Sequence, residues 1–206
     1  MNLKHQYWYF ESALTPRFCD ELIKYGNQQK ETLGLTGDTL NLKEEQIDDL
    51  KKKRNSNVVW LNDLWIYREI HPYVRTANTN AGWNFNWNYS ELCQFTKYKK
   101  QQHYGWHCDS WEEPYKNQKD VNMNGKIRKL SVTCSLSDAK DYKGGELEFS
   151  QRNNLEKDVS TTCTQILPRG SIVVFPSFVW HRVKPVTEGI RYSLVIWNIG
   201  PPYKEC

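Results

Sequence analysis

The first part of the chain shows the spacing of apolar and polar positions that is typical of amphipathic helices. Thr15 and Pro16 have the residue types of a helix N-cap and a first helical position, and Gly26 is a typical residue after a helix end. Between them the apolar residues recur at helical spacing, at Phe18, Cys19, Leu22 and Ile23. This pattern predicts a short helix that ends before Gly26.

A second helical pattern runs from residue 62 to about residue 77 and has one apolar side, formed by Trp65, Ile66, Ile70 and Val74. Pro72 lies inside it. Because proline lacks a backbone N–H and its ring clashes with the preceding turn, we expect two helical pieces. The segment between the two patterns, residues 42–54, is strongly charged with few apolar positions, and we interpret it as a surface helix or a mobile flap.

After Gly82 the pattern changes to the alternation that is typical of β-strands. Trp83, Phe85 and Trp87 alternate with asparagines, which predicts a strand. Further predicted strands follow at 92–98, 129–136, 146–149, 161–167, 171–175, 180–183 and 191–197. Turns that contain glycine separate several of them. Short strands at this spacing predict a mainly β protein with flanking N-terminal helices, built on a jelly-roll or a barrel.

Length and charge are those of one domain without a strong electrostatic field. A chain of 206 residues is predicted to form a single domain, with residues 1–82 as helical support and flap and residues 83–206 as the β core. The long polar stretch 110–127 is interpreted as a lid. The formal net charge is only +4, so neither nucleic acid nor a membrane surface is expected as a partner.

The N-terminal residues contain no apolar run of the kind found in signal peptides, and no segment approaches the roughly 18 apolar residues of a membrane helix. A soluble, cytoplasmic protein is therefore predicted. The six cysteines contain no Cys-x-x-Cys pair, which favours reduced thiols over disulfides or a zinc site.

The tripeptide His107-Cys108-Asp109 and the distant His181 carry the candidate chemistry of this chain. Alternate residues of a strand point to one face, so His107 and Asp109 can reach one metal ion, and a closed jelly-roll brings distant strands to one interior. Two histidines and one carboxylate leave positions open on a ferrous ion, as oxygen-activating non-haem iron enzymes require. Taken alone, His107 also fits an ordinary β-sheet histidine beside an exposed aspartate.

Arg191 adds a fourth candidate group. On a strand it shares a face with Ser193 and Val195, and Ser193 can hydrogen-bond a carboxylate that the guanidinium holds. An inward arginine among apolar residues needs an anionic partner, because an unpaired buried charge is costly. We interpret Arg191 as the anchor of an anionic cosubstrate. An edge-strand arginine in water, or one paired with Glu146, is the alternative.

Five stretches carry a resemblance to a known family: 103–110, 130–137, 144–147, 170–181 and 191–193. In these stretches the sequence resembles the 2-oxoglutarate/Fe(II)-dependent dioxygenases, and within them the prolyl 4-hydroxylase-like branch. The resemblance covers about residues 90–199. It implies a double-stranded β-helix (jelly-roll) core, with Fe(II) held by His107, Asp109 and His181 and the distal carboxylate of 2-oxoglutarate held by Arg191. Dioxygen is then the second cosubstrate, and ascorbate a candidate reductant.

The resemblance extends less closely to other positions. It implies that Tyr98 hydrogen-bonds the cosubstrate and that Thr133 or Ser135 lines its pocket. Where the family commonly has a glycine-rich turn, this chain reads Lys99 to His103, so a role of Tyr98 as a core aromatic is an equal alternative. The candidate substrate contacts are aromatic, with core packing as the alternative for at least one of them: Tyr104, Trp106, Trp111 and Trp180.

The resemblance implies hydroxylation of an unactivated C–H bond, at C4 of a proline in a peptide or protein, with succinate and carbon dioxide as co-products. Hydroxylation of lysine or of a free amino acid is an alternative, and so is a cupin-like binding module without catalysis. A zinc hydrolase would not explain Arg191. Nucleic-acid demethylases of the superfamily usually carry a second arginine six positions after the anchoring one, where this chain has Trp197, which disfavours that branch.

Overall fold

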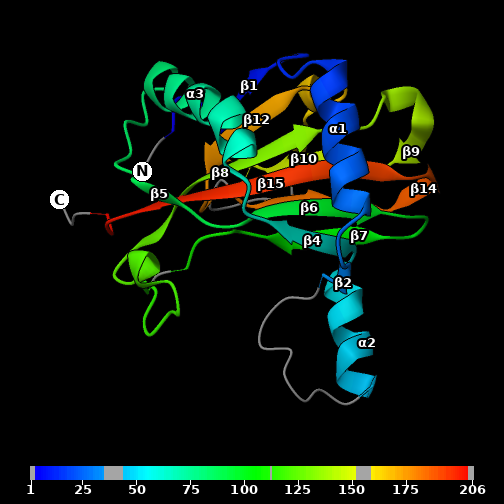
Figure 1. Ribbon diagram of the computed structural model, residues 1–206, viewed down its shortest axis with the longest axis horizontal. Coiled ribbons are helices and arrows are strands. Elements are labelled where there is room, and N and C mark those ends of the chain that lie inside the picture. The colour runs from blue at the N-terminus through cyan, green and yellow to red at the C-terminus, as the bar shows by residue number, and fades with distance from the viewer. Residues whose placement is uncertain (1–2, 35–43, 112, 152–158, 204–206) are drawn as a thin grey trace.

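The computed structural model of the protein describes residues 3–34, 44–111, 113–151 and 159–203 (Figure 1). Its helices are α1 (Pro16–Asn27), α2 (Glu44–Lys53) and α3 (Leu64–Asn80), and short 3-10 turns cover Val121–Met123, Ala139–Asp141 and Thr164–Ile166. Within these ranges no helix is long and apolar enough to cross a bilayer. Cys19, Cys93, Cys134 and Cys163 are buried free thiols, and Cys206 lies outside the described residues.

Helix α1 begins as predicted, with the Thr15 hydroxyl accepting a hydrogen bond from the backbone N–H of Phe18 at 3.2 Å. The predicted end before Gly26 is wrong, because α1 continues to Asn27. Packing explains the glycine: a Cβ at this position would lie 2.5 Å from Cδ1 of Phe95. Gly26 therefore lets the helix lie close against the sheet rather than ending it.

Helix α3 is one continuous helix, so the predicted break at Pro72 is wrong. The buried residues Ile66, Ile70 and Val74 stand on both sides of Pro72 and hold the helix against the core. Pro72 itself is exposed, and the Thr76 hydroxyl donates to its carbonyl at 2.9 Å. Packing of the apolar face thus outweighs the loss of about one hydrogen bond.

Most of the charged segment 42–54 forms a helix. Residues 44–53 make up α2, which extends away from the sheets (Figure 1), while residues 42 and 43 lie outside the described residues. Lys51 and Lys52 pair with Asp48 and Asp49 one turn earlier, at 3.0 and 2.7 Å. Such pairs support a helix that has little apolar surface to bury.

The strands form two antiparallel sheets and a separate pair. The large sheet has eight strands in the order β1 (Trp8–Phe10), β12 (Ile172–Pro176), β8 (Ile127–Ser135), β15 (Arg191–Gly200), β6 (Cys93–Tyr98), β4 (Asn57–Leu61) and β2 (Thr32–Leu33), with β5 (Tyr89–Ser90) paired to β15. The small sheet has five, in the order β11 (Ser160–Thr162), β10 (Leu147–Ser150), β13 (His181–Val183), β7 (His103–His107) and β3 (Arg54–Asn55). The separate pair joins β14 (Val186–Gly189) to β9 (Tyr142–Gly144).

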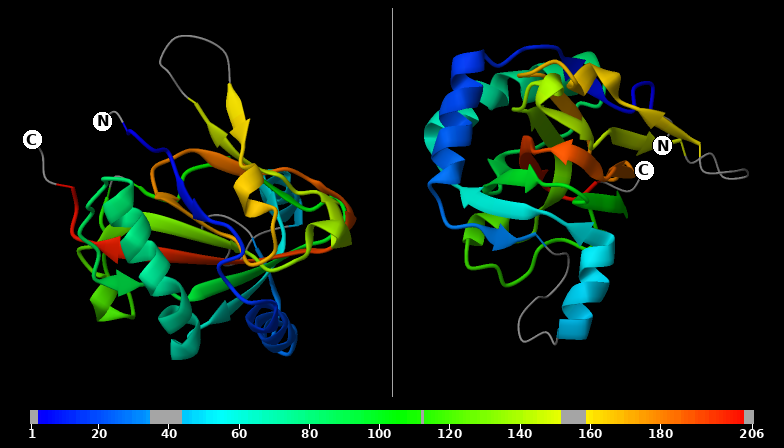
Figure 2. Two further views of the ribbon diagram at one scale, coloured as in Figure 1. Left: turned by 90° about the horizontal axis from the view of Figure 1, so that it is seen from above. Right: turned by 90° about the vertical axis from the view of Figure 1, so that its right-hand side faces the viewer.

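Helices α1 and α3 cover one face of the large sheet, and the small sheet lies across the other face (Figure 2). Strand β12 directs its side chains alternately into the cores on the two faces of the large sheet. Ile172 and Val174 belong to the core under the helices, whereas Val173 and Phe175 belong to the core between the sheets. The prediction of a mainly β jelly-roll with flanking N-terminal helices is confirmed.

Some predicted strands differ from the structure. Residues 83–88 form no strand, because the side-chain amide of Asn78 bonds both backbone groups of Phe85, at 2.9 Å each, and takes the place of a strand partner. The predicted strand 161–167 is cut short, since β11 ends at Thr162 and a 3-10 turn follows. The N-terminal part, expected to be helical support, also supplies β1 to β4.

Candidate metal centre

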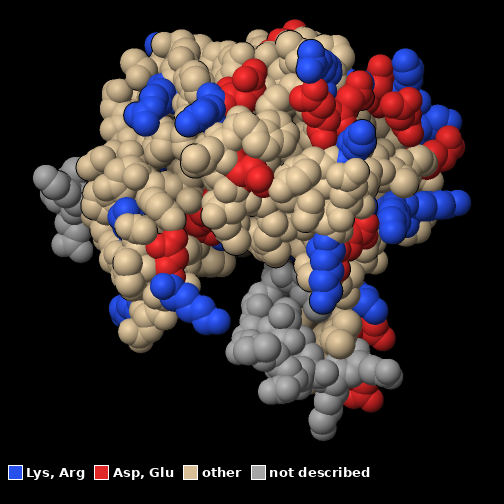
Figure 3. All heavy atoms as spheres, in the orientation of Figure 1, with Lys and Arg blue, Asp and Glu red and all other residues tan. Residues whose placement is uncertain are grey.

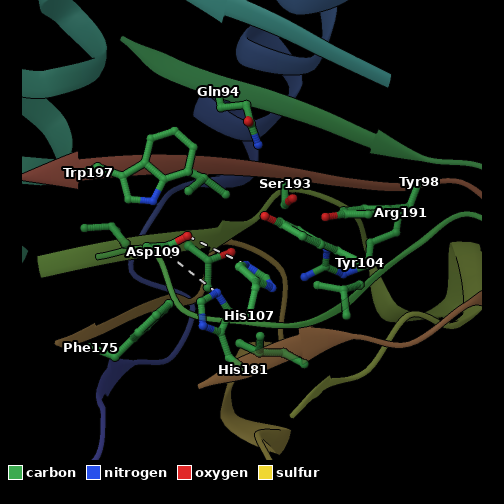
Figure 4. A pocket seen from close by; sticks show the side chains of 15 residues that line it. Gln94, Tyr98, Tyr104, His107, Asp109, Phe175, His181, Arg191, Ser193 and Trp197 are labelled. Atoms are coloured by element: carbon green, nitrogen blue, oxygen red, sulfur yellow. Dashed lines mark ion pairs between the residues drawn. The ribbon is translucent and has the colours of Figure 1, made fainter. Parts of the chain in front are cut away.

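The three predicted metal ligands come together between the two sheets (Figure 4). His107 ends β7 and His181 begins β13, and the two face each other directly in the register of the small sheet. Asp109 lies beyond the end of β7 rather than in the strand, where its N–H donates to the Ser177 carbonyl at 2.8 Å. One ligand atom from each of the three lies within 4.8 Å of the others.

Backbone carbonyls fix both imidazoles. Nδ1 of His107 lies 2.8 Å from the Gly105 carbonyl oxygen, and Nδ1 of His181 lies 3.0 Å from that of Val179. A carbonyl only accepts, so each Nδ1 carries the proton and each Nε2 presents a lone pair. The two Nε2 atoms lie 3.7 and 3.6 Å from the carboxylate oxygens of Asp109. Metal-binding histidines require this orientation.

The charge state of the three groups suits a cation. Burial raises the pKa of Asp109, but its interactions with the neighbouring His181 and His107 and with Arg128, together with a hydrogen bond, outweigh it and lower the pKa to about 2. That hydrogen bond comes from the Ser131 hydroxyl, 2.7 Å from Oδ2. Burial and the nearby His181 lower the pKa of His107 to about 3. A carboxylate and neutral imidazole nitrogens form the donor set that ferrous iron takes.

Aromatic rings enclose the imidazoles. The Tyr104 ring stacks on His107 with 3.4 Å between centroids and 11° between planes, and Phe175 meets His181 edge-on at 4.6 Å. The guanidinium of Arg54 lies 4.5 Å from the centre of the Tyr104 ring. These contacts restrict the imidazoles and keep bulk water from this side of the site.

Arg191 lies in the same pocket as the three metal ligands, toward its other end (Figure 4). It begins β15, pairs in register with Tyr98 of β6, and is 3% exposed. No carboxylate among the described residues lies within ion-pair distance of its guanidinium, and Glu146, the alternative partner, lies 3.9 Å from Lys184 instead. A buried guanidinium without a protein anion points to an anionic ligand.

Side chains from both sheets line the pocket between Arg191 and the histidines. Of the other residues predicted from the sequence, Tyr98, Tyr104, Thr133 and Ser193 line it. Ser135 does not: it is buried at the register position opposite Ser193, outside the pocket wall. Of the two alternatives on β8, Thr133 is therefore the one that faces the pocket.

The three candidate tryptophans lie outside the pocket wall. Trp106 alternates with His107 along β7 and so faces the other way, 4.6 Å from the Arg182 guanidinium. Trp111 is 54% exposed and stands 5.4 Å from the guanidinium of Arg128. Trp180 precedes His181, and its carbonyl accepts from the backbone N–H of Ser150.

Other lining residues are not among those predicted from the sequence: Gln94, Val132, Leu147, Phe175, Val183 and Trp197. Strand alternation provides a signal for two of them, because Gln94 shares a face with Tyr98 and Trp197 shares a face with Arg191. The apolar ones are indistinguishable in sequence from any buried strand residue.

A second, nearly buried arginine, Arg128 of β8, lies at the edge of the pocket. It donates to both carboxylate oxygens of Glu91, at 2.7 and 2.6 Å, and its guanidinium lies 3.9 Å from the centre of the Trp197 ring. The hydroxyl of Tyr115 donates to the same carboxylate at 2.8 Å. Tyr115, within the stretch 110–127 that we interpret as a lid, is thus linked through Glu91 to Arg128.

Comparisons with known proteins place this site in a family context. Residues 93–198 match the family model described as the 2OG-Fe(II) oxygenase superfamily. Over 113 residues the chain is 34% identical to a PKHD-type hydroxylase of Idiomarina loihiensis, covering 53% of this chain and 44% of that protein. Over 94 residues it is 38% identical to a PKHD-type hydroxylase of a Synechococcus species, covering 46% of this chain and 35% of that protein. Each match therefore spans less than half the length of the relative.

Solved structures share the fold. A Pseudomonas putida prolyl-4-hydroxylase has a TM-score of 0.66 at 19% identity, over 95% of this chain and 93% of that chain. A viral collagen prolyl hydroxylase from Paramecium Bursaria Chlorella virus-1, in complex with 2OG, has a TM-score of 0.63 at 16% identity, over 96% and 97%. At these identities the likeness establishes a common fold.

Proposed function

This chain belongs to the 2OG-Fe(II) oxygenase superfamily, and from that premise we propose that it hydroxylates C4 of a proline in a peptide or protein. The cofactor is Fe(II), the cosubstrates are 2-oxoglutarate and dioxygen, and succinate and carbon dioxide are the co-products. One observation carries the proposal: the buried guanidinium of Arg191, without a carboxylate partner among the described residues, shares a pocket with three converging metal ligands.

His107, Asp109 and His181 would hold the iron. Their donor set is two imidazole nitrogens and one carboxylate, and Ser131 orients the carboxylate by its hydrogen bond to Oδ2. Bound iron supplies the activation of dioxygen that couples decarboxylation of 2-oxoglutarate to hydroxylation of the substrate. The backbone carbonyls of Gly105 and Val179 orient the two imidazoles so that each Nε2 presents a lone pair, and the surrounding rings exclude water.

2-Oxoglutarate is a dianion, and Arg191 offers a two-pronged donor for its distal carboxylate. Ser193 lines the same pocket and can donate its hydroxyl to that carboxylate, while Tyr98 and Thr133 border the space from the adjacent strands β6 and β8. Burial raises the pKa of Tyr98, so its hydroxyl stays protonated and can donate to the ligand.

Two observations support a proline-containing substrate. Proteins that share the fold include a prolyl-4-hydroxylase and a collagen prolyl hydroxylase. Aromatic residues border the pocket, since Trp197 lines it and the 47% exposed Trp60 lies 6.2 Å from Trp197, ring to ring. Aromatic surfaces bind proline-rich segments in their extended conformation. The indole N–H of Trp197 has no partner among the described residues, and a substrate carbonyl would satisfy it.

Anaerobic titration with Fe(II) and then 2-oxoglutarate tests the metal and cosubstrate sites. We expect a weak visible charge-transfer band from the chelated keto acid, and no band in a His181→Ala variant. Folded protein that binds neither component would instead favour a binding module without catalysis.

Succinate release tests the substrate. Proline-rich peptides, lysine-containing peptides of the same length and free amino acids are compared in the presence of Fe(II), 2-oxoglutarate and ascorbate, with mass spectrometry of each product. We expect a gain of one oxygen on proline peptides alone. Modification of lysine or of a free amino acid would overturn the substrate assignment and leave the chemistry in place.

A further inference from the structure

A second cavity, of about 400 Å³, opens beside α3 and shares no lining residue with the pocket described above. Its walls are one face of the helix and residues 87–90. Trp87 and the 68% exposed Leu64 supply apolar surface, and Arg68, His71 and Arg75 supply polar groups. The volume is within the roughly 300–1,000 Å³ that ligand sites occupy.

The sequence of α3 separates a buried face from a basic face. Ile66 and Ile70 are fully buried in the core under the large sheet. Arg68, His71 and Arg75 recur at helical spacing and, at about 100° per residue, lie on a different face. The two arginines are seven positions apart in the sequence, which places their backbones about 10 Å apart along the helix axis.

Neither Arg68 nor Arg75 has a carboxylate partner within the part of the chain that the structure describes. The guanidinium of Arg75 lies 4.8 Å from the centre of the Trp87 ring, which holds it in place at one end of the cavity. Basic side chains stand over α3 on the face shown in Figure 3. The cavity therefore has positive charge that the protein leaves unbalanced.

The acidic side chains near this cavity form no ion pair with Arg68 or Arg75 within the described ranges. Asp63 instead accepts a hydrogen bond from Tyr25 at 2.9 Å, and Asp120 accepts one from Tyr89. Glu69 is the next residue after Arg68 and so lies about 100° around the helix from it. An acidic group on a partner would find both guanidiniums available.

His71 forms part of the cavity wall and adds no positive charge to it. Its Nε2 lies 3.0 Å from the Ser90 hydroxyl, and its ring meets Trp87 edge-on at 5.2 Å. Burial, and then the charge of Arg75, lowers the pKa of His71, so the imidazole is neutral at physiological pH. Among the described residues that line the cavity, Arg68 and Arg75 carry the positive charge.

We propose that this cavity is a second binding site, which takes an acidic segment of a partner polypeptide in extended conformation. An extended chain advances about 3.3 Å per residue, so carboxylates roughly three positions apart match the spacing of Arg68 and Arg75. Arg75 is held at the Trp87 end of the cavity and its backbone lies about 10 Å along the helix from that of Arg68, which suits two separate carboxylates better than one small anion. The site is independent of the proposed hydroxylation, since the two cavities share no residue.

Fluorescence anisotropy with the full chain, without iron or 2-oxoglutarate, tests the site. One labelled Gly/Ser peptide carries two glutamates roughly three positions apart, and a second carries glutamines at the same positions. The variant is Arg68→Gln/Arg75→Gln. Its matched control is Lys24→Gln/Lys100→Gln, which removes the same charge at exposed lysines outside the cavity.

We expect the glutamate peptide to bind about tenfold more weakly to the arginine variant and less than about twofold more weakly to the lysine control. A Leu64→Asp variant, which brings negative charge to the cavity, should also weaken binding. Equal binding of the glutamine peptide, or equal losses in variant and control, would overturn the proposal. So would an arginine-dependent site that takes inorganic phosphate and no peptide.

Discussion

Two arginines on neighbouring strands of the large sheet, one nearly buried and one buried, differ in what balances their charge. Arg128 of β8 has a carboxylate within the protein, because Glu91 accepts two of its hydrogen bonds at 2.7 and 2.6 Å. Arg191 of β15 has none among the described residues, although it is only 3% exposed. The charge of Arg128 is thus balanced within the protein, and that of Arg191 needs a ligand.

The metal centre resembles Arg191, because its buried groups also need a ligand to complete their interactions. Its carboxylate and imidazoles are buried and oriented, yet the lone pairs of both Nε2 atoms point toward Asp109 rather than toward a donor. Buried polar groups whose partner is an external ligand contribute to binding and little to the stability of the fold. Groups whose partner lies within the protein contribute chiefly to stability. The comparison therefore predicts which substitutions affect function and which affect folding.

Removal of a metal ligand should have the largest effect. His181→Ala is expected to abolish turnover, because the remaining pair cannot hold iron in the required geometry, while urea denaturation of the apo-protein should show an intact fold. Succinate release measures the activity. The matched control is His103→Ala, since His103 lies outside the pocket wall with Nε2 at 3.0 Å from the Lys52 carbonyl. Full activity of His181→Ala at limiting iron would contradict the assignment.

Loss of the internally paired arginine should have the next largest effect. Arg128→Gln leaves the Glu91 carboxylate, 9% exposed, without its partner and is expected to reduce the free energy of unfolding by about 3 kcal/mol. Urea denaturation of the apo-protein measures this loss. The double variant Arg128→Gln/Glu91→Gln should recover most of the stability. An Arg128→Gln variant as stable as the wild type would contradict the stabilising role of the internal ion pair.

Loss of the unpaired arginine should act on the ligand instead. Arg191→Gln is expected to weaken 2-oxoglutarate binding about a hundredfold, because the distal carboxylate loses its charged donor. The free energy of unfolding of the apo-protein should stay the same or rise. The KM for 2-oxoglutarate and the denaturation midpoint separate the two effects. A destabilisation equal to that of Arg128→Gln would refute the distinction between the two arginines.

The smallest effect is expected on mild acidification of the apo-protein. Burial and His181 lower the pKa of His107 to about 3 in the fold, against about 6.5 in an unfolded chain. Between these values the unfolded chain binds a proton that the folded chain does not. The free energy of unfolding should therefore fall as the pH drops below about 6.5, by at most about 1.4 kcal/mol per pH unit. Denaturation with a chelator present, in the wild type and in His107→Asn, measures the difference. A slope that is unchanged in the variant would contradict the cause.

Sequence periodicity predicted the elements that have a long, regular apolar pattern. The alternation from Arg191 through Ser193 and Val195 places all three in the pocket wall, because β15 is a straight run in the middle of a sheet. The N-cap at Thr15 was also predictable from the sequence, since a hydroxyl at that position has a defined backbone partner.

Tertiary contacts decide what periodicity misses. Strands of two residues such as β2 and β3 are too short to carry a period. The alternation at 83–87 is real, but Asn78 pairs with Phe85 and prevents a strand. Ser131 could not be assigned to Asp109 from sequence, because the contact exists only after β8 lies beside the turn at Ser177.

The position of β15 has a consequence for how the chain is made. It comes last in sequence among the strands of the described residues, yet it lies between β8 and β6 in the large sheet. In a nascent chain the facing edges of β8 and β6 therefore stay unpaired until residues 191–200 emerge from the ribosome. The backbone groups of both edges are exposed to other chains until then. Translation that stops before this strand would release a fragment with unpaired strand edges, so completion of the sheet, and of the pocket that Arg191 lines, depends on residues 191–200.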